Sequence, residues 1–284
     1  MKLRRRWKYG LALGSAGIIL GMIAIWAIGG VLVAPAQRPI LPAPASLHAE
    51  DVEFASESGA IIRGWFVPGK PGQGVVVLMH GVHADRTTLL PRAEFLARSG
   101  YSLLLFDFQG HGESGGKQIT FGYLESRDAT AAVNLMRQRL PGEKIAVLGV
   151  SMGAAAAILA NPPLPVNALI LESCYPTLYQ ATEDRMVIRF SALGKVLTPL
   201  LTCQLKPRLG IRLDDLRPMD AVTKLTTPKF FIAGTADQDT TFAEAAEPKQ
   251  SWWLAGAGHV DMHRFAGSDY EKRVLAFLAL NLGP

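Results

Sequence analysis

A serine held between two glycines is the residue of this sequence whose type and surroundings point most directly to chemistry. Ser151 stands in the run Gly-Val-Ser-Met-Gly at 149–153, between an apolar run at 145–148 and an alanine-rich run at 154–160. A tight strand-to-helix turn needs small flanking residues, and it exposes the serine hydroxyl above the sheet. The pattern predicts Ser151 as a nucleophile, but three fixed positions alone do not establish it.

A serine hydroxyl becomes a strong nucleophile when a base removes its proton and a third group orients that base. Asp237 follows a predicted strand, on a loop that begins with glycine, and His259 follows a later strand directly after a glycine. We predict Asp237 as the acid and His259 as the base. Asp239 is the rival acid, and His263, on the helix-ward side of its loop, is the rival base.

The tetrahedral intermediate of acyl transfer carries an oxyanion that backbone N–H groups must stabilise. One donor is expected from Met152, the residue after the nucleophile, and another from the loop after the strand at 75–79. That loop reads His80-Gly81-Val82, so the Val82 N–H is the expected second donor, and His80 is expected to shape the loop. Surface or loop-packing positions are expected for three other histidines: His48, His83 and His111.

The elements that must position these residues alternate along the chain. Apolar runs predict strands at 52–55, 61–67, 75–79, 102–106, 145–148, 168–171, 229–233 and 251–254. Helical patterns cover 86–99, 123–140, a segment from 151, and 270–282. The alternation predicts an α/β fold in which a mostly parallel, doubly wound sheet carries helices on both faces. Residues 50–284 are expected to form this domain.

One stretch of the chain does not fit the alternation. More than 50 residues separate the strand that ends near Glu172 from the one that starts near Lys229, too many for a simple crossover. Apolar residues recur in it as on one helical face, which Pro199 should kink or end; they are Met186, Phe190, Leu193, Leu197 and Leu200. We predict a helical insertion at about 175–225, either a lid over the site or plain packing helices.

Five ordered motifs make the chain from about residue 50 to its C-terminus resemble the α/β-hydrolase superfamily. They are His80-Gly81 with Arg86 shortly after, the run at 106–114, the Ser151 turn, Gly234-Thr235-Ala236-Asp237, and Gly258-His259. The set is similar to the serine aminopeptidase-like and monoacylglycerol-lipase-like branch and its membrane-anchored relatives, and the order Ser151, Asp237, His259 is that of the superfamily. The resemblance implies an α/β-hydrolase fold, with Asp107 and His111 in a structural loop outside the triad. The sequence departs from the family where a proline often follows the acid, since it has Asp239-Thr240-Thr241 there.

The first 33 residues combine a basic cluster with a long apolar run. Five bases and no acid occupy residues 1–8, and residues 9–33 carry no charge. The run is long enough to cross a bilayer, whereas the apolar part of a signal peptide usually has about 7–15 residues. We expect an uncleaved transmembrane signal anchor at 9–33 rather than a leader cleaved near 34–36. Residues 1–8 would then be cytoplasmic and the catalytic domain extracytoplasmic, on a proline-rich stalk at 34–49.

The charge balance argues against a nucleic-acid-binding protein, and the cysteines argue against a metal or redox site. The net charge of +5 equals that of the N-terminal cluster, because 24 bases and 24 acids remain after it. A balanced domain does not favour nucleic acid as a partner. Cys174 and Cys203 lack the spacing of a metal or redox motif. We expect two separately buried thiols, with one disulfide as the alternative in an oxidising compartment.

These patterns predict a membrane-anchored serine hydrolase that cleaves an ester, thioester or amide through an acyl-enzyme, without metal or organic cofactor. An esterase or lipase acting on a lipophilic acyl substrate is favoured. An aminopeptidase-like peptidase is the alternative, in which Glu172, Glu183 and Asp184 are candidates to recognise a peptide amine. The third hypothesis is a non-catalytic binding module on the same fold, which typically lacks a triad member, and none is lacking here.

Overall fold

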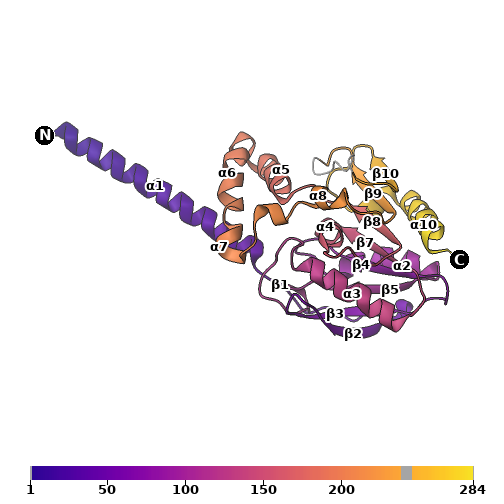
Figure 1. The fold of residues 1–284 in the computed structure, drawn as a ribbon. Helices are drawn as coiled ribbons and strands as arrows, with labels where there is room; N and C mark the ends of the chain where they lie inside the picture. The colour runs from indigo at the N-terminus through magenta and orange to yellow at the C-terminus, as the bar shows by residue number, and fades with distance from the viewer. Residues whose placement is uncertain (1, 238–244, 284) are drawn as a thin grey trace.

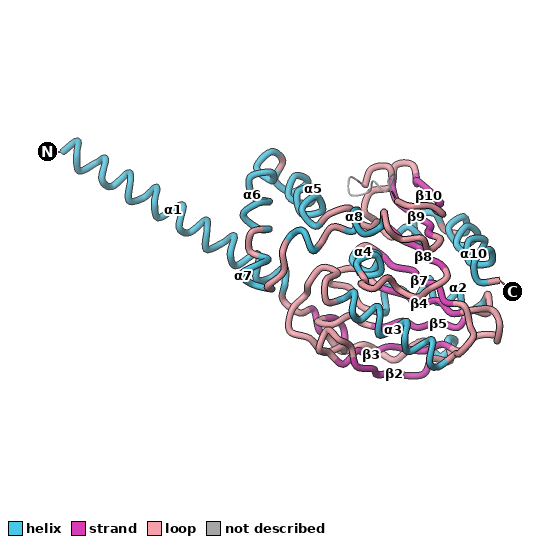
Figure 2. Tube along the Cα trace, viewed as in Figure 1, coloured by secondary structure: helices cyan, strands magenta, loops and turns pink. Residues whose placement is uncertain are grey.

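The computed structural model describes residues 2–237 and 245–283, and over these residues its centre is an eight-stranded sheet (Figures 1 and 2). The strand order is β10-β9-β8-β7-β4-β5-β3-β2. The bounds are β2 (Glu50–Ala55), β3 (Ile61–Val67), β4 (Val75–Met79), β5 (Ser102–Phe106), β7 (Ile145–Val150), β8 (Ala168–Glu172), β9 (Lys229–Gly234) and β10 (Lys249–Leu254). Strands β2 and β3 pair antiparallel, as do β3 and β5, and the other pairs are parallel. The predicted mostly parallel sheet is confirmed.

Helices cover both faces of this sheet. They are α2 (Leu90–Arg98), α3 (Glu125–Arg139), α4 (Met152–Leu159), α9 (Met262–Ala266) and α10 (Ser268–Leu282), with the 3-10 helix η2 (Arg86–Leu89) ahead of α2. Helices α3 and α4 share one buried core with Val75 and Val77 of β4, whereas α2 and α10 share the other with Val76 and Leu78. Because side chains alternate along a strand, a strand covered on both faces must be apolar throughout, and this explains the continuous run of β4.

The insertion after β8 consists of α5 (Leu178–Phe190), α6 (Ala192–Thr202), α7 (Leu205–Leu209), the 3-10 helix η3 (Leu213–Asp215) and α8 (Pro218–Val222). The single apolar helical face expected here is split, because the chain turns at Ser191, where φ is 51°. Pro199 lies inside α6 and does not end it. Gly194 permits the close crossing of α5 and α6, since a Cβ there would lie 2.3 Å from the carbonyl carbon of Met186.

Helix α1 (Lys2–Val33) projects from the domain (Figure 1). Its segment Gly14–Val33 is long and apolar enough to cross a membrane, by length and composition only. The last turns of α1 contact the insertion. Gln204 donates a hydrogen bond to the carbonyl of Ile25 (3.1 Å), and the Arg208 guanidinium lies 4.0 Å from the centroid of the Trp26 ring.

The segment after α1 differs from the expected stalk at 34–49, because it lies against the domain. Strand β1 (Ala36–Gln37) pairs in parallel with β6 (His111–Gly112), and the Ile119 N–H donates to the carbonyl of Val33 (2.9 Å). Arg38 pairs with the buried Asp85 at 2.5 Å. These contacts attach the segment to the loops beside β4 and β5.

The two cysteines do not form the disulfide that was kept as an alternative. Cys174 is buried and Cys203 is exposed. The expectation of two separately buried thiols is therefore right for Cys174 and wrong for Cys203.

Candidate active site

The turn between β7 and α4 holds Ser151 in an unusual backbone conformation, with φ 51° and ψ −110°. Such a conformation costs a non-glycine residue on the order of 1–3 kcal/mol. The two flanking positions must be glycine, because neighbouring backbone atoms leave no room for a Cβ. A Cβ at Gly149 would lie 2.6 Å from the Ala154 nitrogen, and one at Gly153 would lie 2.4 Å from the Met79 carbonyl oxygen. The sequence pattern thus folds into the sharp turn that was predicted.

Backbone contacts place the expected oxyanion donors beside this serine. The Ser151 N–H donates to the Glu172 carbonyl (2.8 Å). Met152 is the first residue of α4, and the first N–H groups of a helix have no acceptor within it. A Cβ on Gly81 would lie 3.6 Å from the Ser151 Cβ, so the loop that carries Val82 runs alongside the serine. Ser151, Met152 and Val82 line one cavity.

Asp237 and His259 are joined by a hydrogen bond of 3.0 Å between Oδ2 and Nδ1. The Asp237 side chain is 3% exposed and the His259 side chain 28%. Their two loops are connected, because the Ala236 N–H donates to the Ala257 carbonyl (2.9 Å). Gly234 makes room for that contact, since a Cβ there would lie 2.0 Å from the Ala257 oxygen. A buried carboxylate held against an imidazole can orient it as a base.

Ser151, Asp237 and His259 all follow the carboxyl ends of strands. The register aligns Val150 with Glu172, Glu172 with Ile232, and Leu254 with Gly234, so the three residues lie at one edge of the sheet. Within the described part of the chain, no hydrogen bond joins the Ser151 hydroxyl to the His259 ring. Catalytic hydrogen bonds are often long until a substrate is bound.

Of the two rival residues, one has a structural role. His263 Nε2 hydrogen-bonds with Glu271 (3.0 Å), and its ring packs against Phe95 and Tyr270. These contacts give His263 a structural role between α9 and α10, so it is a weaker candidate for the base than His259. Asp239, the rival acid, lies outside the described residues.

Two buried histidines shape the loop that carries Val82. The Phe108 N–H donates to His80 Nε2 (3.0 Å), so the proton is on Nδ1, which donates to the Gly81 carbonyl (2.7 Å). In the same way, the His83 N–H donates to His111 Nε2 (3.1 Å). Burial, with a smaller contribution from the charge of His111, lowers the pKa of His80 to about 3. His80 is thus a neutral structural residue, as expected.

His80 gives a testable dependence of stability on pH. Its pKa is about 3 in the folded protein and about 6.5 in the unfolded chain, so below pH 6.5 the unfolded chain binds the proton and the folded protein does not. The contribution of His80 to stability must therefore fall as the pH is lowered from 6.5, by up to about 1.4 kcal/mol per pH unit. The substitution His80→Gln removes this titratable group from both the folded and the unfolded state.

We expect urea unfolding at pH 7, 6 and 5 to show that the stability advantage of the wild type over His80→Gln shrinks steadily with acidification. Parallel pH profiles of the two proteins would contradict this assignment.

A buried ionic network connects the nucleophile turn with the histidine loop. Arg92 of α2 donates two hydrogen bonds to the Glu172 carboxylate (2.6 and 3.0 Å) and one to Asp261 (2.8 Å). Burial alone would lower the pKa of Arg92, but the charge of Glu172 raises it above its ordinary value. Glu172 is therefore the buried ion-pair partner of Arg92, and the prediction that it could recognise a peptide amine is wrong.

Removing Arg92 is expected to destabilise the fold. Arg92→Met leaves the buried Glu172 charge uncompensated, which costs about 3–5 kcal/mol. Arg98→Met changes an exposed arginine on the same helix and serves as the matched control. In urea unfolding, we expect a large fall in midpoint for Arg92→Met and a small change for Arg98→Met. Equal shifts in the two variants would mean that the buried network contributes little to stability.

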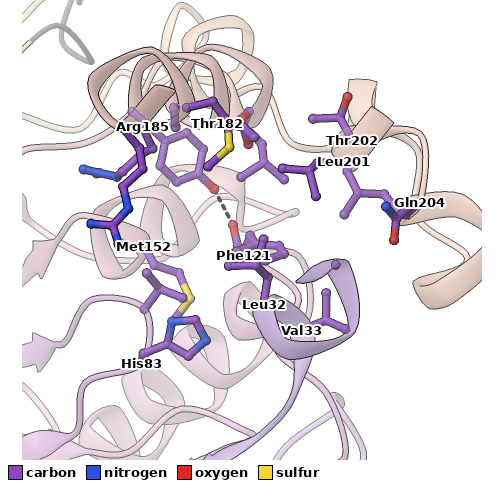
Figure 3. A pocket seen from close by; sticks show the side chains of 18 of the residues that line it. Leu32, Val33, His83, Phe121, Met152, Thr182, Arg185, Leu201, Thr202 and Gln204 are labelled. Atoms are coloured by element: carbon purple, nitrogen blue, oxygen red, sulfur yellow. Dashed lines mark hydrogen bonds between the residues drawn. The ribbon is translucent and has the colours of Figure 1, made fainter. Parts of the chain in front are cut away.

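An apolar cavity of about 590 Å³ opens above Ser151 (Figure 3). Its walls come from four parts of the chain: the loop of Val82 and His83, the loops at Phe121 and Tyr175, helices α5 to α7, and the end of α1. Figure 3 shows Met152 and His83 facing Thr182 and Arg185 across it, with Leu32 and Val33 of α1 at one side. The sequence predicted Val82 beside Ser151 and a helical insertion at about 175–225 as a possible lid, but not the walls formed by Phe121, Tyr175 and the end of α1. For His83 there was a signal, its place one residue after the expected oxyanion donor.

The comparisons with known proteins agree with this architecture. The model of a family described as serine aminopeptidase, S33 matches residues 70–214. An uncharacterised protein of Salmonella typhi, YfhR, is 28% identical over 245 residues, which cover 80% of this chain and 79% of that protein. The uncharacterised protein Rv2307c of Mycobacterium tuberculosis is 28% identical over 281 residues, covering 94% of this chain and 92% of that one.

Among solved structures, an esterase of Pyrococcus furiosus, Pf2001, superposes with a TM-score of 0.72 at 26% identity. The superposition covers 89% of this chain and 99% of the esterase. The similarity confirms the α/β-hydrolase fold that the five sequence motifs implied.

Proposed function

The chain belongs to the serine aminopeptidase S33 family of α/β-hydrolases, and from that premise we propose that it is a membrane-anchored serine hydrolase cleaving carboxylic esters. Ser151 attacks the acyl carbon, and His259 accepts the serine proton and later protonates the leaving group. Asp237 orients His259, while the N–H groups of Val82 and Met152 stabilise the oxyanion. The acyl group resides on Ser151 until water, activated by His259, releases it.

The observation that carries this proposal is the strained turn at Ser151, which faces an apolar cavity. A positive φ at a non-glycine residue is retained at functional sites although it costs stability. The bonded pair of Asp237 and His259 at the same sheet edge supplies the chemistry that a lone serine lacks. The likeness to the Pyrococcus esterase supports the ester as the scissile bond.

The lining of the cavity favours an ester over a peptide. A pocket for a free peptide amine needs a carboxylate, but among the described lining residues the charged ones are arginines: Arg185, Arg189 and Arg208. Glu183 and Asp184, proposed from the sequence for that role, lie on α5 but do not line the cavity. A comparison of nitrophenyl esters with aminoacyl anilides is expected to favour the esters.

A fluorophosphonate probe tests the proposal directly on the full-length protein in mild detergent. We expect the wild type to be labelled and Ser151→Ala to remain unlabelled. Ser173→Ala is the matched control, since Ser173 also has a positive φ (44°) and follows the adjacent strand β8. Wild-type protein that resists labelling, or a Ser151→Ala variant that is still labelled, would overturn the proposal.

A further inference from the structure

The end of helix α1 is part of the candidate active-site cavity. Gly29, Leu32 and Val33 line the same cavity as Ser151, although more than 100 residues separate them in the sequence. The Gln204 side chain packs directly on the α1 backbone here, since a Cβ at Gly29 would lie 2.2 Å from its Oε1. The end of α1 therefore forms part of the cavity wall.

The aromatic residues of α1 indicate which part of it the membrane would enclose. Trp7 and Tyr9 precede Trp26 by 19 and 17 positions in one continuous helix, which is about 28 and 26 Å along its axis. Tyrosine and tryptophan prefer the two interfaces of a bilayer, whose hydrocarbon core is about 30 Å thick. With Trp26 at the outer interface, where Arg208 covers its ring, the turns at 27–33 stand at the membrane surface.

The insertion carries an exposed apolar surface at the same level. In Figure 1, α6 and α7 lie beside the end of α1, and the sheet lies on their far side. Five large apolar side chains on α5 and α6 are between 45% and 74% exposed: Ile188, Phe190, Leu193, Val196 and Leu200. Lys195 is exposed among them, as is Arg189, which also lies at the cavity. Apolar side chains interspersed with bases suit the boundary between acyl chains and lipid headgroups.

From these observations we propose that the cavity takes its acyl substrate laterally from the bilayer that holds α1, with the last turn of α1 forming one wall of the acyl site. The inference rests on the proposed serine hydrolase and names its substrate class, long-chain acyl esters resident in the membrane. The surface of α5 and α6 rests on the lipid beside α1, so that an ester group at headgroup level reaches Ser151 while its chain occupies the cavity.

Enlarging the α1 wall tests the acyl site. Leu32→Trp places a larger side chain in the cavity, whereas Val31→Trp enlarges the adjacent residue, which is 71% exposed and does not line it. For full-length protein in detergent, we expect Leu32→Trp to lower kcat/KM for nitrophenyl palmitate about tenfold or more, with nitrophenyl butyrate changed about twofold at most. Val31→Trp should leave both unchanged. Equal losses for the two esters, or for the two variants, would show that the end of α1 is not a wall of the acyl site.

The location of the substrate tests the lateral route. Full-length protein is reconstituted in phosphatidylcholine–phosphatidylglycerol vesicles, and a long-chain diacylglycerol, which its two acyl chains hold in the bilayer, is placed in the same vesicles or in separate ones. We expect turnover at least tenfold faster from the same vesicles. Equal rates would overturn lateral access.

Fluorophosphonate labelling separates the failure of this inference from the failure of the proposed function. Labelled Leu32→Trp and Val31→Trp proteins have folded active sites. If the ratio of kcat/KM for the palmitate and butyrate esters is then unaltered, only the proposed place of α1 in the acyl site is contradicted. An unlabelled wild type counts against the hydrolase itself.

Discussion

Ser151→Ala is expected to lower kcat for an acyl ester by about 10⁴- to 10⁶-fold, the range found when a triad nucleophile is removed. The Asp237–His259 pair and the two N–H donors remain in the variant, but no acyl-enzyme can form on alanine. A nitrophenyl butyrate assay on the full-length protein measures the loss. Residual turnover within about 100-fold of the wild type would mean that another group performs the reaction.

Replacing the same residue by glycine separates catalysis from strain. With φ 51° and ψ −110°, position 151 holds a conformation that glycine adopts readily and that serine and alanine adopt at a cost. Ser151→Gly should be as inactive as Ser151→Ala and more stable than it by about 1 kcal/mol, after the greater unfolded-state freedom of glycine is allowed for. Thermal unfolding compares the two variants. Equal or lower stability of the glycine variant would show that the turn is not strained.

Asp237→Asn is expected to lower kcat by about 10⁴-fold near neutral pH. An amide at this position can donate to His259 Nδ1, which leaves the proton on Nε2 and removes the ring's ability to accept the serine proton. The substitution keeps the shape of the side chain, so the fold should be little affected. Ester hydrolysis, together with a thermal unfolding profile, distinguishes the chemical loss from misfolding.

Asp239→Asn is the matched control for this prediction, because Asp239 is the rival acid two positions along the chain. We expect its activity to stay within a few-fold of the wild type. If Asp239→Asn were the more damaging variant, the acid of the triad would be Asp239, and the bond from His259 to Asp237 would be an alternative arrangement.

The sheet and the candidate triad could be predicted because local rules determine both. Strands buried on two faces must be continuously apolar, and β4 and β5 have the predicted bounds. The turn at Ser151 requires glycine on each side, which the sequence displays directly. Parallel strands of one sheet then bring residues after β7, β9 and β10 to a common edge without further information.

The insertion at about 175–225 was predicted as a possible lid, but the part that the end of α1 takes in the cavity was not, because it arises from contacts between distant segments. The helix was expected to kink or end at Pro199, but α6 continues through that residue. The break lies at Ser191, which is neither glycine nor proline, so the residue types did not indicate it. Prolines at 35, 39, 42 and 44 are consistent with the end of the continuous helix at Val33. They could not reveal that β1 pairs with β6, because a strand of two residues has no periodic pattern.

The pairing of β1 with β6 has a kinetic consequence for the membrane enzyme proposed here. A free tether would let the domain sample a volume of solution and meet soluble and lipid substrates alike. With Ala36–Gln37 paired and Arg38 bound to Asp85, the domain is instead held against the end of its helix. Its encounters are then confined to two dimensions, so its rate should follow the mole fraction of substrate among the surrounding lipids and not the amount of substrate per volume of solution.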